Sequence, residues 1–274
     1  MIFQRLIWAA LATALVVGSV QTGVQHLQAA PLILAAEVFE SQKAKAIEPV
    51  APAAHAHTEA AAPENPHDHA AASAWEPENG FERTGWTWVA NTLHVFSMAL
   101  LLFAVMGVCL WRGTALRSLP LALWTAAAGW LVFHFWPSLG LNAEIPGMDA
   151  ARLGSRQGWW LLAAVSAALA CASIAGLRSH LRWLAAAAWL ALPYVVGAPH
   201  ISTDPLAGFG PEAQTALRQL GTQFIWATTW ISLSFWASMG LVGGLAFQRW
   251  VQPGLMGVLK GAGVADVGAG KAVR

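Results

Sequence analysis

The sequence is poor in charged residues, tyrosine and cysteine. Asp, Glu, Lys and Arg together make up 11% of its 274 residues, whereas ordinary globular domains carry about a quarter. Combined with 57% hydrophobic residues, this deficit does not fit a water-soluble domain and points to an integral membrane protein. The two cysteines, Cys109 and Cys171, lie inside apolar runs. They form neither a disulfide framework nor a C-x-x-C motif, so we expect small buried thiols.

The sequence also lacks the motifs of several catalytic and binding classes. It contains no nucleophile elbow, no helical H-E-x-x-H and no basic groove for nucleic acid. Residues 265–272 nearly match a phosphate-binding loop, but Ala272 supplies no hydroxyl for magnesium and only two residues follow it. We therefore expect a protein that is not an enzyme, binds no nucleotide and has no nucleic-acid partner.

Six apolar runs follow one another along the chain, each near the ~20 residues that cross a hydrocarbon core. The first resembles a signal peptide, but Gln21, Gln25 and Gln28 continue it on one helical face, which suits a retained helix inside a bundle. The sequence predicts an all-α integral membrane protein, a bundle of about six transmembrane helices in a lipid bilayer. The runs cover residues 6–20, 86–111, 119–136, 159–177, 183–199 and 224–247.

Between the first and second runs lies a segment of Ala, Pro, Glu and His. This segment, residues 41–85, cannot bury enough apolar area to offset its chain entropy, so we expect a disordered outer linker. Its histidine pairs could collect divalent transition metals loosely, or they could be incidental to a polar linker. The pairs are His55 with His57 and His67 with His69. The predicted divisions are residues 1–40 (first helix and outer extension), 41–85 (linker), 86–248 (five-helix bundle) and 249–274 (Gly-rich tail).

The charges divide between the two sides that six spans would create. One side carries nine basic residues and one acidic residue, a net charge of +8, and the other carries six basic and thirteen acidic residues, a net charge of −7. The short loops 112–118 and 178–182 each hold two arginines and no acid, and such loops stay in the cytoplasm. We therefore expect both termini in the cytoplasm, with the linker and the loops 137–158 and 200–222 outside.

One segment between two apolar runs gathers several polar side chains. Residues 133–160 are interrupted by Pro137, Gly140, Pro146 and Gly147, so they cannot form a single helix. Polar loop backbone needs water or protein partners, which places this segment at a membrane face. It carries Glu144 and Met148, both of which can bind a metal ion, and His134 near its start, at the end of the third run.

Four of the five histidines outside the linker map to the outer half of the predicted bundle. Each alone could be a hydrogen-bonded structural residue, but polar groups in hydrocarbon usually face a bundle interior. Imidazole, carboxylate and thioether together suit cobalt, nickel or zinc, and scattered, incomplete coordination is what a transport path needs. The candidate ligands are His26, Glu37, Glu40, His94, His134, Glu144, Met148 and His200.

Several of these positions carry a likeness to a known family. The sequence resembles the CbtA family, probable cobalt transporter subunits, over most of the chain outside the linker tip and the tail. The resemblance implies cobalt(II) as the transported ion, uptake for cobalamin synthesis, five spans, and a small single-span partner (CbtB) with a histidine-rich end. The matching positions are Gln25, His26, Pro31, Glu37 and Glu40; Arg83 and Thr84; Pro137, Leu139, Gly140, Leu141, Glu144, Pro146, Gly147 and Met148; Arg156, Gln157, Trp159 and Trp160; and Gly197 to His200.

We therefore predict a subunit of a divalent cobalt uptake transporter in the bacterial inner membrane, able to act as an oligomer. Two alternatives stay open. The first is a membrane haem or quinone oxidoreductase subunit, in which His94 and His134 would be axial haem ligands. The second is a non-catalytic assembly subunit of another transporter.

Overall fold

The computed structural model describes residues 2–47, 75 and 77–261, and every regular element in this part of the chain is a helix. Five helices are long and apolar enough to cross a membrane, and a sixth, α7 (Leu181–Val196), is apolar but shorter. The prediction of an all-α membrane bundle is confirmed. The fifth apolar run of the sequence is the short helix α7. The five longer spans are Ile2–Gln28, Phe81–Trp111, Ser118–Ser138, Leu153–Gly176 and Pro211–Leu259.

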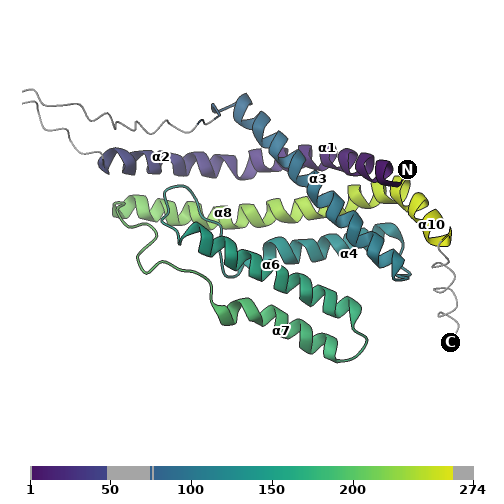
Figure 1. Cartoon of the computed structure of the whole chain (residues 1–274). Coiled ribbons are helices and arrows are strands. Elements are labelled where there is room, and N and C mark those ends of the chain that lie inside the picture. Colours follow the sequence, from purple (N-terminus) through teal and green to yellow (C-terminus); the bar gives the residue numbers. More distant parts are fainter. Residues whose placement is uncertain (1, 48–74, 76, 262–274) are drawn as a thin grey trace, which may run out of the picture.

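Two helical rods are much longer than a bilayer is thick. α1 (Ile2–Gln28) is followed after one residue by α2 (Ala30–Ile47), and the two lie end to end (Figure 1). The second rod starts at α8 (Pro211–Ser238) and runs on through four further helical segments. From Pro211 to Leu259 it has 49 residues, about 74 Å along an α-helical path, against a hydrocarbon core of about 30 Å. The four segments are η2 (Met239–Gly243), α9 (Gly244–Ala246), η3 (Phe247–Val251) and α10 (Gln252–Gly261).

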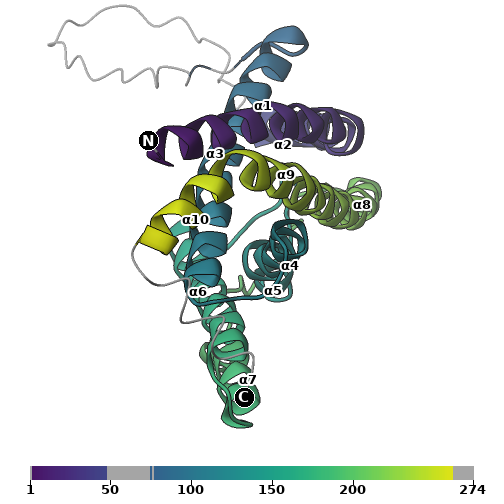
Figure 2. The same ribbon diagram turned by 90° about the vertical axis from the view of Figure 1, so that its right-hand side faces the viewer.

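The remaining helices fill the space beside these rods. α3 (Phe81–Trp111) packs along α1 and crosses it at an angle, and α6 (Leu153–Gly176) packs along α7. In both views α7 lies at the edge of the bundle, far from α1 (Figures 1 and 2). Between them runs a span that contains a π-helical turn. It consists of α4 (Ser118–Trp130), η1 (Leu131–Phe135) and α5 (Trp136–Ser138).

The main core is built from small side chains where helices cross closely. A Cβ at Gly240 would lie 2.9 Å from the Ala126 Cβ, and one at Gly244 would lie 2.7 Å from the Ala122 Cβ. Only glycine therefore permits this approach of η2 and α9 to α4, as is common between membrane helices. Around this crossing pack the fully buried side chains of Phe103, Met106, Met239 and Phe247.

A second, smaller core caps one end of the bundle. It joins α2, the loop 139–152, the loop 197–210 and the first turns of α8. Because these elements lie beyond the apolar parts of the spans, we name this cluster the cap and define it by its buried residues. They are Ala36, Ile145, Leu206 and Leu217.

Several helices extend further than the sequence pattern suggested. α2 continues to Ile47 and α3 begins at Phe81, so both ends of the predicted linker are helical. α8 begins at Pro211, inside the predicted loop 200–222, and α10 reaches Gly261, inside the predicted tail. The linker histidines His55, His57, His67 and His69 lie outside the described residues.

Candidate functional site

A cavity of about 700 Å³ lies between α1, α2, α3, η1 and α8. Three of the predicted ligands line it: His26 from α1, His94 from α3 and His134 from η1. Met98 adds a thioether, and the side chains of Thr228 and Ser232 add hydroxyls from α8. Three of the four histidines that the sequence placed at one depth therefore line one cavity.

One face of α3 supplies a ladder of polar groups along this cavity. Arg83, Thr87, Asn91, His94 and Met98 all line it, at spacings of three or four residues that bring them onto one side of the helix. From Arg83 to Met98 the ladder spans about 22 Å of helix. The cavity is thus deep, with the Arg83 guanidinium at one end and the Met98 thioether at the other.

Amide and hydroxyl groups join α1 to α3 in the wall of the cavity. The Asn91 Nδ2 group donates to Thr22 Oγ1 at 2.9 Å and to Gln25 Oε1 at 2.7 Å. Gln21 is 7% exposed and also lines the cavity, and its Oε1 atom has no hydrogen-bond partner within the protein. This wall therefore offers oxygen acceptors to whatever enters.

The third histidine sits in a locally widened turn. η1 is a π-helical segment, and such bulges inside α-helices often occur at functional sites. Its His134 Nε2 atom lies 3.5 Å from Thr229 Oγ1 of α8, and its ring lies 6.2 Å from the Trp130 ring. The π-turn thereby presents His134 to α8 and to the cavity.

Aromatic rings close the deep end of the cavity. Phe133 and Trp236 are stacked with ring centres 5.9 Å apart, and Phe235 meets Trp236 edge to face at 5.2 Å. His94 lies against Phe235 at 5.4 Å. Phe235 and Trp236 also belong to the main core, so the cavity, which we name the vestibule, adjoins this core at its deep end.

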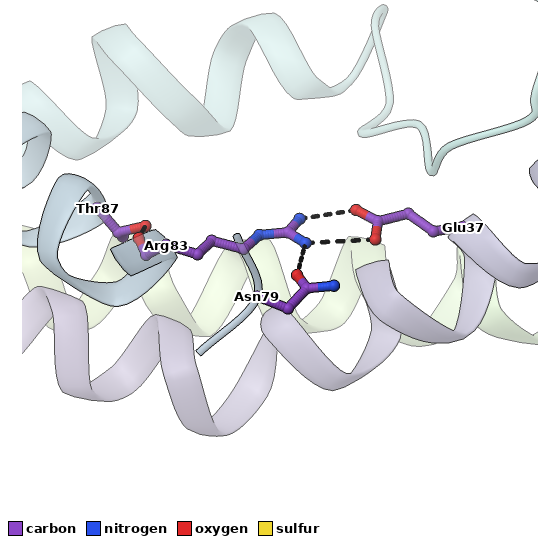
Figure 3. A network of polar contacts seen from close by, with 4 residues as sticks. All are labelled: Glu37, Asn79, Arg83 and Thr87. Atoms are coloured by element: carbon purple, nitrogen blue, oxygen red, sulfur yellow. Dashed lines mark hydrogen bonds and ion pairs between the residues drawn. The ribbon is translucent and has the colours of Figure 1, made fainter. Parts of the chain in front are cut away.

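A network of polar contacts lies at the opposite end, the mouth (Figure 3). The two terminal nitrogens of Arg83 donate to the two carboxylate oxygens of Glu37, at 2.7 and 3.3 Å. The same guanidinium donates to Asn79 Oδ1 at 2.8 Å. Glu37, a predicted ligand from α2, is thus bound to an arginine of α3 beside the vestibule.

The other predicted ligands lie around a second pocket of about 460 Å³ under the cap, which Glu144, Met148 and His200 line. Glu144 forms an ion pair with Arg156 at 2.6 Å. Glu40 is near this region, because its Cβ lies 3.6 Å from where a Gly147 Cβ would be. The structure therefore divides the eight predicted ligands between two places.

Charged pairs also fasten the loops of this second region. Asp204 accepts a hydrogen bond from the Leu206 backbone N–H at 3.0 Å and pairs with Arg218 at 2.7 Å. The Leu206 hydrogen bond, and then Arg218, hold the pKa of Asp204 below its usual value. Lys43 of α2 pairs with Asp149 at 3.6 Å and lies over the Phe209 ring. These contacts tie α2 and α8 to the two loops.

The ligand prediction has a clear geometric outcome. Within the described ranges, no three His, Cys, Asp or Glu side chains come close enough to hold one ion together. Three histidines line the vestibule, while His200 lies at the second pocket because α7 packs on α6 at the edge of the bundle. The sequence interpretation missed Asn79, Thr228 and Ser232, which also line the vestibule. The four-residue spacing from Arg83 to Thr87 and Asn91 puts these side chains on one face of a helix and could have pointed to the mouth of the vestibule.

The sequence model of one family, the probable cobalt transporter subunit CbtA, matches residues 3–248. The chain belongs to the CbtA family. Comparisons with curated proteins and with solved structures find no match. A subunit of a CbtA transporter implies partner subunits and a multi-pass membrane location, and cobalt as the transported ion. CbtA membership favours transport over enzymatic activity and does not favour the haem or quinone oxidoreductase alternative.

Proposed function

We propose that this CbtA chain forms the outer part of a path for divalent cobalt across the bacterial inner membrane, supplying cobalamin synthesis. The observation that carries the proposal is the vestibule, where imidazoles from three helices line one space in a chain of a cobalt transporter family. His26, His94, His134 and Met98 are the groups that would meet the ion there. Glu40, Glu144, Met148 and His200 would act earlier, at the second pocket under the cap.

The chemistry of the vestibule suits passage better than storage. Arg83 is the only charged side chain among the described residues that line it, and no acid lines it. Six waters occupy about 180 Å³, so a hydrated ion fits in the space and need not lose its whole shell at once. Neutral imidazole, amide and thioether groups exchange with these waters and bind an intermediate ion such as cobalt(II) without trapping it.

The surroundings of the path follow from charge and composition. The basic loops between α3 and α4 and between α6 and α7 support cytoplasmic termini, which would turn the cap and the vestibule mouth outward. The histidine pairs of the linker, His55 with His57 and His67 with His69, would gather ions on that side. A small single-span histidine-rich subunit of the CbtB kind is the partner that we propose for this assembly.

Cobalt uptake into vesicles tests the path. We expect the double variant His94→Ala/His134→Ala to take up cobalt at least ten times more slowly, because two of the three vestibule imidazoles are gone. His180→Ala is the matched control, since His180 precedes α7 and does not line the vestibule. Wild-type rates in the double variant would remove these histidines from the mechanism.

The partner and the metal need a second experiment. Vesicles containing this chain with and without the single-span subunit should be compared, with nickel and zinc competing against cobalt. Transport by the chain alone would exclude the assembly-subunit alternative. If nickel or zinc were taken up in preference to cobalt, the proposed path would still hold, but the transported ion would be that metal.

A further inference from the structure

The ion pair at the vestibule mouth connects two helices that diverge. α3 crosses the first rod at an angle, and its first turns stand away from α2 (Figure 1). Glu37 of α2 and Arg83 of α3, 46 positions apart in the chain, meet across this gap. The pair therefore lies on the cap side of the vestibule, where Asn79 and Arg83 line its mouth.

The guanidinium of Arg83 occupies a set of oxygen atoms that would also suit a metal ion. Both oxygens of Glu37 and the amide oxygen of Asn79 surround it, within 3.3 Å. Carboxylate and amide oxygens, completed by water, are ordinary ligands of divalent cations. No acid lines the vestibule among the described residues, and Glu37 is the carboxylate that Arg83 holds at its entrance.

We infer that the Arg83 guanidinium occupies the binding site of the arriving cation: a divalent ion replaces it on Glu37 and Asn79, and the guanidinium moves away. This inference rests on the proposed function, because it assigns the binding step at the entrance of the vestibule on that path. An ion of charge +2 attracts the Glu37 carboxylate more strongly than a guanidinium of charge +1 does. Before an ion arrives, the charges of Arg83 and Glu37 cancel. The Glu37 carboxylate is therefore not left without a counter-charge, and the neutral pair does not repel the ion.

The exposure of the pair allows this exchange. The side chains of Arg83 and Glu37 are 37% and 36% exposed, so water reaches both partners. Exposed pairs of this kind contribute little to folding, and a long arginine side chain finds other positions easily. Variants at these positions should therefore fold, which makes the exchange open to direct measurement.

The test is manganese binding by the full chain in lipid nanodiscs, with free Mn²⁺ read from its electron paramagnetic resonance signal. Mn²⁺ prefers oxygen ligands, and the linker histidines are the same in every variant. Arg83→Gln should bind about fivefold more tightly than the wild type, because an exposed ion pair competes by up to that factor. Glu37→Gln should lose this binding, and Arg83→Gln/Glu37→Gln should behave as Glu37→Gln does. Cobalt should displace the bound Mn²⁺.

A purely structural ion pair gives a different pattern. Both single variants would then change stability alike and leave manganese affinity unchanged, which would overturn the inference. Retention of the gain in the double variant would overturn it as well. Asn79→Ala, combined with Arg83→Gln, should remove part of the gain and checks the third oxygen independently. If vesicles show no cobalt transport while Arg83→Gln still binds more tightly, the ion site stands and the proposed path falls.

Discussion

Replacing Gly129 with alanine should displace the Trp236 ring from the deep end of the vestibule, which we also call its floor. Gly129 lies on α4, and a Cβ there would come within 2.7 Å of Trp236 Cε3 and closer still to two other ring atoms. Trp236 is 7% exposed and is stacked on Phe133, so the ring has little free space. It would need to move by about 1 Å to reach an ordinary contact distance.

The size of the effect follows from two opposing contributions. Overpacking of a tight core costs about 1–3 kcal/mol, while alanine is favoured over glycine in a helix by about 1 kcal/mol. Because the ring is confined on its opposite face, we take the upper part of the overpacking range, about 2–3 kcal/mol, and expect Gly129→Ala to lower the free energy of unfolding by about 1–2 kcal/mol. This corresponds to about a 5–30-fold change in the ratio of folded to unfolded protein.

Unfolding of the detergent-solubilised protein measures this change, and Gly107→Ala provides the matched control. At Gly107, which is also helical, the nearest atom to a new Cβ is Leu255 Cδ2 at 3.9 Å, an ordinary contact. The control should therefore be as stable as the wild type or slightly more stable. Equal stability of the two variants would refute the packing of Trp236 against α4, and with it the aromatic floor of the vestibule.

Two further changes test other contacts. Asn91→Leu removes both hydrogen bonds to Thr22 and Gln25. At roughly 0.6–1.7 kcal/mol per bond, the free energy of unfolding should fall by about 1–3 kcal/mol. Ser97→Ala, whose hydroxyl bonds only to its own helix, should have little effect, and equal effects of the two changes would contradict the α1–α3 hydrogen bonds. The lowered pKa of Asp204 predicts stabilisation that is complete above about pH 4 and lost as pH falls through the lowered pKa. The melting temperatures of wild type and Asp204→Asn should therefore differ above about pH 4 and converge below the lowered pKa of Asp204. A difference in melting temperature that does not change with pH would contradict the loop contacts.

Hydrophobic length and histidine depth could be predicted from the sequence because both are local properties. The apolar runs indicated the spans, and placing His26, His94 and His134 at one level needed only the order of the runs. Which helices are neighbours within the membrane is not local. His200 ended at a different pocket because α7 contacts α6 rather than α1 or α3.

Helix ends and long-range ion pairs escaped the sequence analysis for physical reasons. The first turns of α8 hold Glu212 and Arg218, so hydropathy indicated a loop, although Leu217 and Leu220 pack into or against the cap. The partner of Glu37 could not be read from spacing, since Arg83 reaches it from the far side of the linker. The π-turn at His134, whose ring approaches Thr229 of α8, leaves no sequence signature that we recognise.

The rod from α8 to α10 has a mechanical consequence. It contributes Leu217 to the cap, Phe235 to the floor of the vestibule and Phe247 to the main core, without a break in its helical path. Between Leu217 and Phe235 the path is one α-helix, whereas η2 and η3 further on are π-helical, and helices kink at such bulges. A movement of the cap would therefore reach the deep end of the vestibule through α8 as one piece, and a bend of the path should fall at η2, beside the close glycine contacts at Gly240 and Gly244.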